Sequence, residues 1–259
     1  MIRPAVFIDK DGTLVEDVPY NVDPARIALA PGAGEALRRL QAAGYALVVV
    51  SNQSGVARGY FPESALAAVE ARIRELLAAE GAGIDAFLYC PHLPDGAVAA
   101  YAVRCGCRKP APGLQLRAAE KLELDLPASW MVGDILDDVE AGNRAGCRTV
   151  LLDVGHETEW LSGPYRRPTA CAHDLLAAVH MIVTCPRPPS LREGAIQDSP
   201  VPAAYTIEHR SSASARPHQE TIDFDSTRAI AGRIQVREPA RKSARWITLS
   251  LRGRARGSV

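Results

Sequence analysis

Residues 1–185 of this 259-residue chain alternate between short apolar runs and amphipathic stretches. The runs have the length and composition of buried strands, and the stretches have the periodicity of helices. This alternation predicts an α/β fold, with a parallel sheet covered by helices on both faces. Ligands of such sheets bind beyond the carboxyl ends of the strands. The predicted strands are 5–9, 46–51, 84–89, 130–133 and 149–153, and the predicted helices are 34–43, 62–80, 113–122, 135–145 and 172–183.

Residues 186–259 lack this alternation. They are rich in proline and arginine, with weak strand-like runs at 222–236 and 246–251. The formal net charge of zero hides an excess of basic side chains in this segment and of acidic ones in residues 1–185. We therefore predict one domain over 1–185 and a basic, largely disordered tail over 186–259. A cryptic small domain, or a frameshifted end without function, would give the same pattern.

The composition does not suggest a membrane or secreted protein. The start of the chain leads directly into a predicted strand, without an apolar signal segment. Its apolar runs are much shorter than the ~20 residues that span a bilayer. We expect a cytoplasmic monomer without nucleic-acid or membrane partners. In that compartment, the six cysteines are expected to be thiols or metal ligands rather than disulfides.

Two aspartates, Asp9 and Asp11, follow the first predicted strand. Side chains two positions apart in an extended segment point the same way, so these carboxylates repel each other unless a cation or a shared proton intervenes. Mg²⁺ commonly binds one or two carboxylates together with a phosphate. Gly12 permits a sharp turn, and Thr13 adds a hydroxyl. The string predicts a Mg²⁺ site, although a plain Asp-Gly turn is the simpler alternative.

Two polar loops offer groups for a phosphate. The sequence S-N-Q-S-G at 51–55 supplies hydroxyl, amide and backbone N–H groups, as an ordinary polar loop also would. In R-K-P at 108–110, the lysine can act as a point charge on a phosphoryl group, and the arginine can grip a second anion. A solvated surface pair is the alternative there.

Acidic residues also follow the fourth predicted strand. Asp134 can complete a Mg²⁺ site with Asp9. Asp137 and Asp138 fall in the first turn of the next predicted helix, where negative charge is favourable. We interpret these two as helix charges.

Four motifs, in their order along the chain, resemble the haloacid dehalogenase (HAD) superfamily of phosphatases. Longer strings at 51–59, 90–92 and 107–110 resemble, more narrowly, the family of D-glycero-D-manno-heptose-1,7-bisphosphate 7-phosphatases and histidinol-phosphatases. The resemblance covers about residues 4–180 and implies a HAD-like (Rossmannoid) fold. No insertion is long enough for a large cap domain. The four motifs are D-x-D-G-T at 9–13, S-N-Q at 51–53, R-K-P at 108–110 and G-D-x-x-x-D at 133–138.

The resemblance implies covalent catalysis. Asp9 would attack phosphorus to form an aspartyl-phosphate, and Asp11 would protonate the leaving alkoxide and then activate water. Mg²⁺ would bind Asp9, Asp134 and the backbone carbonyl of Asp11. Ser51 and Lys109 would hold the phosphoryl oxygens. The implied substrate contacts are Asp17, Val18, Pro19, Tyr20, Asn52, Gln53, Ser54 and Arg108.

One position departs from the best-known pattern of this family. Ile135 stands where some members have a lysine that can touch the substrate. Isoleucine cannot supply that charge, so a contact there must be apolar or made by the backbone. The resemblance therefore leaves the exact substrate open.

A cluster of soft ligands lies in the irregular region after the third strand. Cys90, His92, Cys105 and Cys107 supply three thiolates and one imidazole, which suit a closed tetrahedral Zn²⁺ site. The one-residue spacing differs from the commoner C-x-x-C, and buried thiols beside a surface histidine are the alternative. The family that the chain resembles has the same cluster. This favours a structural zinc that stabilises the loop leading to Lys109.

The leading hypothesis is a Mg²⁺-dependent phosphatase acting on a small phosphorylated sugar. The resemblance implies removal of the 7-phosphate of D-glycero-D-manno-heptose 1,7-bisphosphate, for heptose precursors of lipopolysaccharide or other surface glycans. A histidinol-phosphatase is the enzymatic alternative, because it shares the motifs and the zinc cluster. A catalytically silent, zinc-stabilised binding module is the alternative from another class, but the complete set of acidic and basic site residues argues against it.

Overall fold

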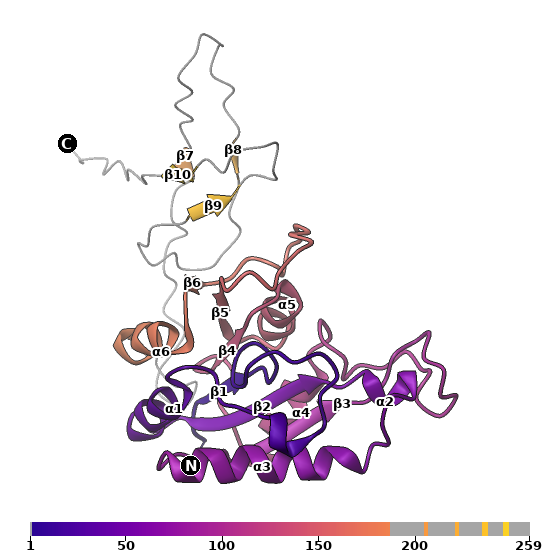
Figure 1. Cartoon of the computed structure of the whole chain (residues 1–259). Coiled ribbons are helices and arrows are strands. Elements are labelled where there is room, and N and C mark those ends of the chain that lie inside the picture. Colours follow the sequence, from indigo (N-terminus) through magenta and orange to yellow (C-terminus); the bar gives the residue numbers. More distant parts are fainter. Residues whose placement is uncertain (1, 187–204, 207–220, 223–234, 238–245, 249–259) are drawn as a thin grey trace, which may run out of the picture. The chain divides into compact units, whose positions relative to one another are not determined.

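The computed structural model describes residues 2–186 and four short strands of the remaining segment (Figure 1). The chain divides into two units, Met1–Glu193 and Gly194–Val259. In the second unit, two antiparallel pairs form, β7 with β8 and β9 with β10. Most of the predicted tail lies outside the described residues, so its disorder stays a prediction. The four strands are β7 (Tyr205–Thr206), β8 (Thr221–Ile222), β9 (Gln235–Arg237) and β10 (Trp246–Thr248).

The first unit is built around a parallel sheet. Its strands are β1 (Ala5–Ile8), β2 (Ala46–Asn52), β3 (Ala86–Cys90), β4 (Trp130–Gly133), β5 (Arg148–Leu152) and β6 (Ala170–Ala172). They lie in the order β3-β2-β1-β4-β5-β6, and every neighbouring pair is parallel. The strand that precedes the D-x-D-G-T motif therefore lies between β2 and β4, near the middle of the sheet (Figure 1).

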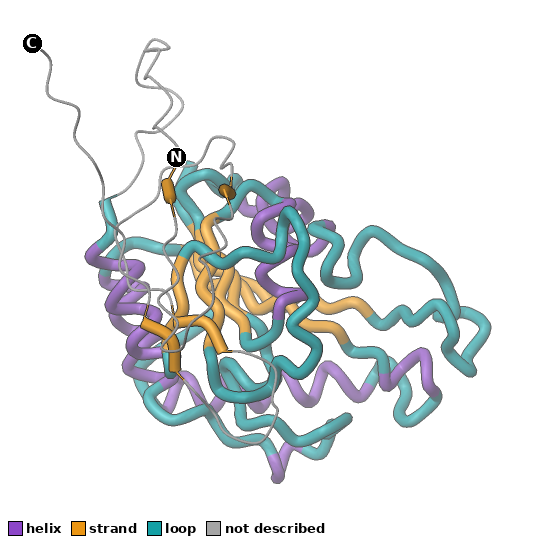
Figure 2. The backbone as a smooth tube through the Cα atoms, turned by 90° about the horizontal axis from the view of Figure 1, so that it is seen from above, coloured by secondary structure: helices purple, strands orange, loops and turns teal. Residues whose placement is uncertain are grey.

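Helices cover both faces of this sheet, as predicted (Figure 2). They are α1 (Ala33–Ala42), α2 (Gly55–Arg58), α3 (Ala65–Ala79), α4 (Gly113–Leu122), α5 (Leu136–Arg144) and α6 (Leu175–Thr184). Alternate residues of β1 serve opposite faces, because side chains alternate along a strand. Val6 and Ile8 belong to the core beneath α1, α3 and α6, whereas Ala5 and Phe7 belong to the core beneath α4.

The predicted elements of residues 1–185 are all present, with small shifts at their ends. The largest shifts are at the starts of α3 and α6. The predicted helix 172–183 begins at Leu175 instead, because the residues just before it pair with β5 as β6. The Asp174 side chain then caps α6 by accepting the N–H of Ala177 at 2.7 Å. The short elements β6, α2 and the 3-10 turn η1 (Pro24–Arg26) were not predicted, because they are too short for a periodic pattern.

Two long connections follow strands near the middle and at one edge of the sheet. The connection from β1 to α1 contains η1 and isolated bridges of Val15 with Asp11 and Leu29. The connection from β3 to α4 contains no helix or strand. Within residues 2–186, neither connection forms a separate cap domain, which agrees with the prediction. No helix in the described part of the chain has the length and apolar character needed to cross a membrane.

Candidate active site

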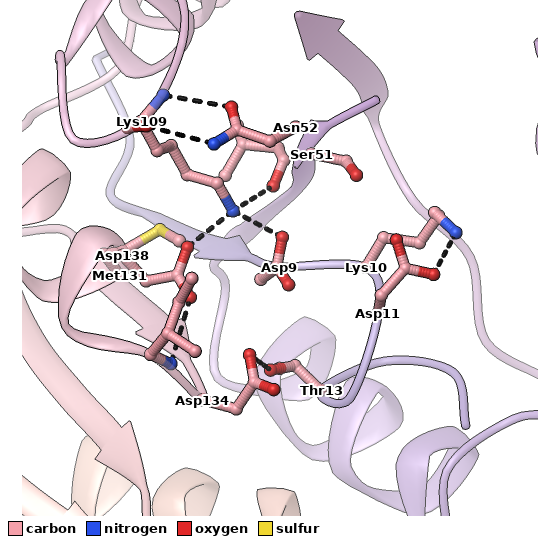
Figure 3. Close-up of polar contacts among 12 residues, drawn as sticks. Asp9, Lys10, Asp11, Thr13, Ser51, Asn52, Lys109, Met131, Asp134 and Asp138 are labelled. Carbon is pink, nitrogen blue, oxygen red and sulfur yellow. Dashed lines mark hydrogen bonds and ion pairs between the residues drawn. The ribbon is translucent and has the colours of Figure 1, made fainter. Parts of the chain in front are cut away.

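The polar motifs come together at the carboxyl ends of three neighbouring strands of the sheet (Figure 3). Asp9 follows β1, and its backbone N–H donates to the carbonyl of Val132 in β4 at 2.9 Å. Ser51 lies in β2, and Asp134 follows β4 directly. Because β2 and β4 flank β1, residues that are far apart in sequence become neighbours in space. Asp9 lies at the centre of this arrangement, as the parallel sheet requires.

Lys109 enters the site from the loop before α4 and is almost completely buried. Its ammonium forms ion pairs with Asp9 and Asp138 and donates to the carbonyl of Val50 at 3.2 Å. Burial alone would lower the pKa of Lys109, but the two carboxylates raise it, so the side chain is a cation. The Asn52 side chain fixes the Lys109 backbone through two hydrogen bonds of 3.0 Å. Asn52 therefore positions the lysine in addition to its predicted place beside the substrate.

Three buried carboxylates form a cluster around this lysine. Oxygens of Asp9, Asp134 and Asp138 lie within 4.8 Å of one another. Burial raises the pKa of Asp134 to about 6, and the charge of Asp9 adds to this effect. Burial also raises the pKa of Asp138, and the charge of Lys109 opposes this rise. Three carboxylates facing one lysine leave excess negative charge in a buried space, so the cluster suits a cation with oxygen ligands, such as Mg²⁺.

The interpretation of Asp138 as a helix charge is incomplete. Its carboxylate is fully buried, and one oxygen lies 2.5 Å from the Lys109 ammonium. The other oxygen accepts the N–H of Ile135 at 3.4 Å, which caps α5. Asp137 behaves as predicted, because it is half-buried at the surface and pairs with Arg166 at 2.8 Å. Asp138 thus belongs to the site as well as to the helix.

Asp11 stands beside the cluster in a separate hydrogen-bond network. Its carboxylate pairs with Lys10 and accepts a hydrogen bond from the Gln53 amide at 3.1 Å. The same amide donates to the Ser51 hydroxyl at 2.8 Å, which links the two motifs. Burial is the largest cause that raises the pKa of Asp11, while the charge of Lys10 lowers it. A carboxyl group with a raised pKa exchanges protons closer to neutral pH, as a general acid–base requires.

His156 lies next to the site, although no sequence motif indicated a chemical role for it. Its Nδ1 lies 2.6 Å from one oxygen of Asp134, and the Thr13 hydroxyl donates to the other oxygen at 3.4 Å. Gly12 allows this close approach, because a Cβ at position 12 would collide with both Asp134 and His156. Gly12 also has a φ of +74°, a conformation that favours glycine. A lone histidine after a strand carries no sequence signal of this contact.

A cavity of about 260 Å³ opens beside Asp11. Two predicted substrate contacts do not line it. Val18 accepts the backbone N–H of Asn21 within the loop after β1, and the Arg108 guanidinium donates to the carbonyl of His92 at 3.5 Å. Lys10, Asn21 and Gly55 complete the lining and were not predicted from the sequence. The predicted contacts that do line the cavity are Asp17, Pro19, Tyr20, Asn52, Gln53 and Ser54.

The four soft ligands also meet in space. The three sulfur atoms of Cys90, Cys105 and Cys107 lie 3.3–3.6 Å apart. His92 Nδ1 lies 3.6 Å from the sulfur of Cys90 and 3.4 Å from that of Cys107. Ligands about 2.3 Å from a tetrahedral zinc would be separated by about 3.8 Å, so this set is compact enough to share one ion. The arrangement fits the predicted zinc site.

Comparisons with known proteins agree on one family. The profile of the HAD-hydrolase-like family matches residues 106–178. The D-glycero-D-manno-heptose-1,7-bisphosphate 7-phosphatase of Thermosynechococcus vestitus is 42% identical over 191 residues, which cover 71% of this chain and 97% of that protein. The D-glycero-beta-D-manno-heptose-1,7-bisphosphate 7-phosphatase of Mesorhizobium japonicum is 46% identical over 181 residues, which cover 69% of this chain and 83% of that protein.

Solved structures give the same result. A HAD-like phosphatase from Mesorhizobium loti has a TM-score of 0.61 and 40% identity, with 70% of this chain and 88% of that chain covered. The D,D-heptose 1,7-bisphosphate phosphatase of B. bronchiseptica, solved with magnesium and phosphate, has a TM-score of 0.59 and 30% identity. That match covers 70% of this chain and 98% of the other. Both matches include nearly the whole of the compared phosphatase.

Proposed function

The chain belongs to the HAD-type phosphatase family of D-glycero-D-manno-heptose-1,7-bisphosphate 7-phosphatases, and we propose that it uses Asp9 to remove the 7-phosphate of that sugar. The observation that carries this proposal is the position of Asp9, held at the central strand end by the sheet and paired with the buried Lys109. The product is a heptose 1-phosphate for the synthesis of surface glycans such as lipopolysaccharide.

Asp9 and Asp11 have different catalytic roles, as nucleophile and as general acid–base. The ion pair with Lys109 orients Asp9 for attack on phosphorus. The P–O bond to the sugar then breaks, and Asp11 donates a proton to the departing alkoxide. Asp11 next takes a proton from the water that attacks the aspartyl-phosphate and regenerates Asp9. The Gln53 amide supports this exchange because it holds Asp11 beside Ser51.

Lys109 and Ser51 hold the phosphoryl oxygens. Phosphoryl transfer depends mainly on positioning and charge neutralisation, and both groups are fixed before substrate binds. Lys109 is fixed by Asn52 and Asp138, and Ser51 is fixed by Gln53. A preorganised cation of this kind stabilises the charge that spreads over the oxygens during transfer.

The carboxylate cluster is the proposed Mg²⁺ site. Asp9, Asp134 and the Asp11 backbone carbonyl are the proposed protein ligands, and Asp138 holds the lysine next to them. When bound, Mg²⁺ neutralises charge on the phosphoryl group. The solved relative with magnesium and phosphate supports this assignment.

The Cys/His cluster is the proposed structural zinc site. Its four ligands are mutually close, and a closed set of four leaves no position for a substrate. The zinc would stabilise the loop between Cys90 and Cys107, and Lys109 follows two residues later. It therefore supports the position of the catalytic lysine without taking part in the chemistry.

We place the active domain in residues 1–185, as a monomer in the cytoplasm, and treat 186–259 as dispensable for catalysis. All six cysteines are free, which supports a reducing compartment. Residues 1–185 carry an excess of acidic side chains, which gives the active domain no electrostatic reason to bind nucleic acid. Truncation and sizing experiments on the purified protein test these assignments.

Substrate competition tests the proposed function directly. The ratio of kcat/KM values on the α and β anomers of the heptose bisphosphate and on histidinol phosphate reports differential binding of the transition states. We expect one heptose anomer to be preferred over histidinol phosphate by at least about 100-fold. A preference for histidinol phosphate would support the second enzymatic candidate, which shares the same motifs. Absence of Mg²⁺-dependent hydrolysis with every phosphate ester, including an aryl phosphate, would support the silent binding module.

A further inference from the structure

Two consecutive residues of the loop after β5, His156 and Glu157, contact the segment that carries Asp134. His156 Nδ1 lies 2.6 Å from one carboxylate oxygen of Asp134. The Glu157 carboxylate accepts the backbone N–H of Leu136, the first residue of α5, at 2.6 Å. These contacts hold the side chain of Asp134 and also the backbone two positions after it. We call His156 and Glu157 the Asp134 clamp.

The clamp is fixed within its own loop. Gly155 has a φ of +89°, a conformation that favours glycine and turns the chain sharply just before His156. The other carboxylate oxygen of Glu157 accepts the backbone N–H groups of Glu159 at 2.8 Å and Trp160 at 3.3 Å. Hydrogen bonds from backbone N–H groups to a carboxylate are strong, and three of them hold Glu157 in one orientation.

The D-x-D-G-T motif packs against the contact between His156 and Asp134. The Thr13 hydroxyl donates to the second oxygen of Asp134 at 3.4 Å (Figure 3). A Cβ at position 12 would collide with the first oxygen and would lie 2.5 Å from His156 Nδ1. The Asp134 side chain is only 7% exposed, whereas that of His156 is 38% exposed. The histidine therefore reaches from a partly exposed loop into a buried part of the site.

Asp134 is the member of the carboxylate cluster that the buried lysine does not hold. Its oxygens lie within 4.8 Å of oxygens of Asp9 and Asp138. The Lys109 ammonium pairs with those two carboxylates, and within residues 2–186 it forms no ion pair with Asp134. Like charges in a buried site repel, so an unheld Asp134 would turn away from its neighbours. A carboxylate can only accept a hydrogen bond, so His156 Nδ1 donates to it and opposes this movement.

We propose that the Asp134 clamp positions Asp134 as a ligand of the catalytic Mg²⁺, with His156 fixing the carboxylate and Glu157 fixing the backbone. This inference rests on the proposed function, which places Asp134 in the Mg²⁺ site, and it adds residues that lie outside the four motifs. Hydrogen-bond partners of metal ligands orient them before the ion binds, and loss of such a partner typically weakens metal affinity about 10- to 100-fold. His156 is a positioning residue, because it acts through Asp134.

Calorimetric titration of the full chain with Mg²⁺ measures this effect without substrate. His156→Ala should raise the Kd for Mg²⁺ about tenfold, because the carboxylate must then be ordered when the ion binds. His156→Asn should recover most of the loss, because its amide keeps a neutral N–H donor near the position of Nδ1. Glu157→Ala should raise the Kd less, about threefold, because Glu157 acts on Asp134 only through the backbone.

Kinetics on an aryl phosphate give a second readout. The Mg²⁺ concentration that gives half of the maximal rate should rise about tenfold in His156→Ala. At saturating Mg²⁺, kcat should fall less than about threefold, because the added ion restores the occupied site. Ion pairs with an exposed partner add little to stability, so the thermal midpoint should move by less than about two degrees. A histidine with a purely structural role would lower the thermal midpoint and leave the Kd for Mg²⁺ unchanged.

Two further variants separate this inference from the proposed function. His173→Ala removes an exposed histidine that pairs with Asp174 at 3.2 Å, and it should leave the Kd unchanged. Asp134→Asn should abolish Mg²⁺ binding, and unchanged binding in this variant would overturn the clamp. An unchanged or lower Kd in His156→Ala, or no recovery in His156→Asn, would also overturn the clamp while the proposed function stands. Wild-type protein that binds no Mg²⁺ would overturn the clamp and the proposed Mg²⁺ site together.

Discussion

The two candidate metal centres of this molecule follow opposite designs. The carboxylates of Asp9, Asp134 and Asp138 gather at the ends of central strands, where a buried lysine only partly balances their charge. The Cys/His cluster begins at Cys90, the last residue of the edge strand β3, and its ligands chiefly contact one another. A carboxylate cluster with unbalanced negative charge beside a cavity can bind both a cation and an anionic substrate. A closed set of four ligands can bind only its metal ion. The difference predicts a catalytic centre and a structural one.

Removal of the nucleophile should give the largest effect. Asp9→Asn keeps the shape of the side chain but removes its negative charge and its ability to form the aspartyl-phosphate, which is an acyl phosphate. We expect kcat/KM on an aryl phosphate with Mg²⁺ to fall on the order of 10³-fold or more, as for other nucleophile deletions. Circular dichroism checks that the variant is folded. Equal rates for the variant and the wild type would exclude Asp9 as the nucleophile.

Two adjacent aspartates provide a matched test of the carboxylate cluster. Asp138→Asn weakens a buried ion pair with Lys109, so we expect about 3 kcal/mol less stability and a large loss of activity. Asp137→Asn removes an ion pair with Arg166 nearer the surface, so we expect a change below about 1 kcal/mol and near-normal activity. Chemical denaturation and aryl phosphate kinetics measure both quantities. Indistinguishable variants would show that the two aspartates have the same role.

Asp137 and Asp138 also show which features could be predicted from the sequence and which could not. The alternation of strands and helices predicted the parallel sheet, and parallel strands necessarily place Asp9, Ser51 and Asp134 at one edge. Burial of Asp138 could not be predicted, because an acidic first turn of a helix looks the same in sequence whether it is buried or exposed. Packing makes the difference, since Gly133 leaves the space that the Asp138 carboxylate occupies.

Contacts made by isolated residues also could not be predicted from the sequence. His156 contacts Asp134 across 22 positions, without a motif to connect them. Asn52 was predicted to touch substrate, and the structure adds its two hydrogen bonds to the Lys109 backbone. The Cys/His cluster was visible because four ligand residues in a short segment form a recognisable pattern. The sequence thus indicated the ligands that belong to a recognisable motif. It did not indicate single side chains that enter the site from another loop.

Loss of the soft ligands should have an intermediate effect. In Cys105→Ser/Cys107→Ser, the zinc content should fall from about one to zero per chain, and the thermal midpoint should drop by several degrees. Loosening of the loop before Lys109 should raise KM for phosphate esters severalfold, while Asp9 remains reactive. Metal analysis, calorimetry and kinetics measure these changes. Cys171→Ser, which changes an exposed free thiol, is the control. Full activity and stability in the double variant would refute the structural role of zinc.

Removal of the second unit should have the smallest effect. A chain that ends at Glu193 retains the first unit whole. We expect its kcat/KM on the heptose bisphosphate to stay within about twofold of the full chain, because changes remote from the site rarely exceed about 0.5 kcal/mol. An inactive truncated protein would show that residues 194–259 contribute to catalysis or folding.

The identity of the phosphate that Asp9 attacks is the most direct test of the account. Phosphorus NMR can follow heptose 1,7-bisphosphate during incubation with the wild-type protein and Mg²⁺, because the two phosphates give separate signals. We predict that the signal of the 7-phosphate converts to inorganic phosphate while the signal of the 1-phosphate persists. Loss of the 1-phosphate signal first, or persistence of both signals, would contradict the account.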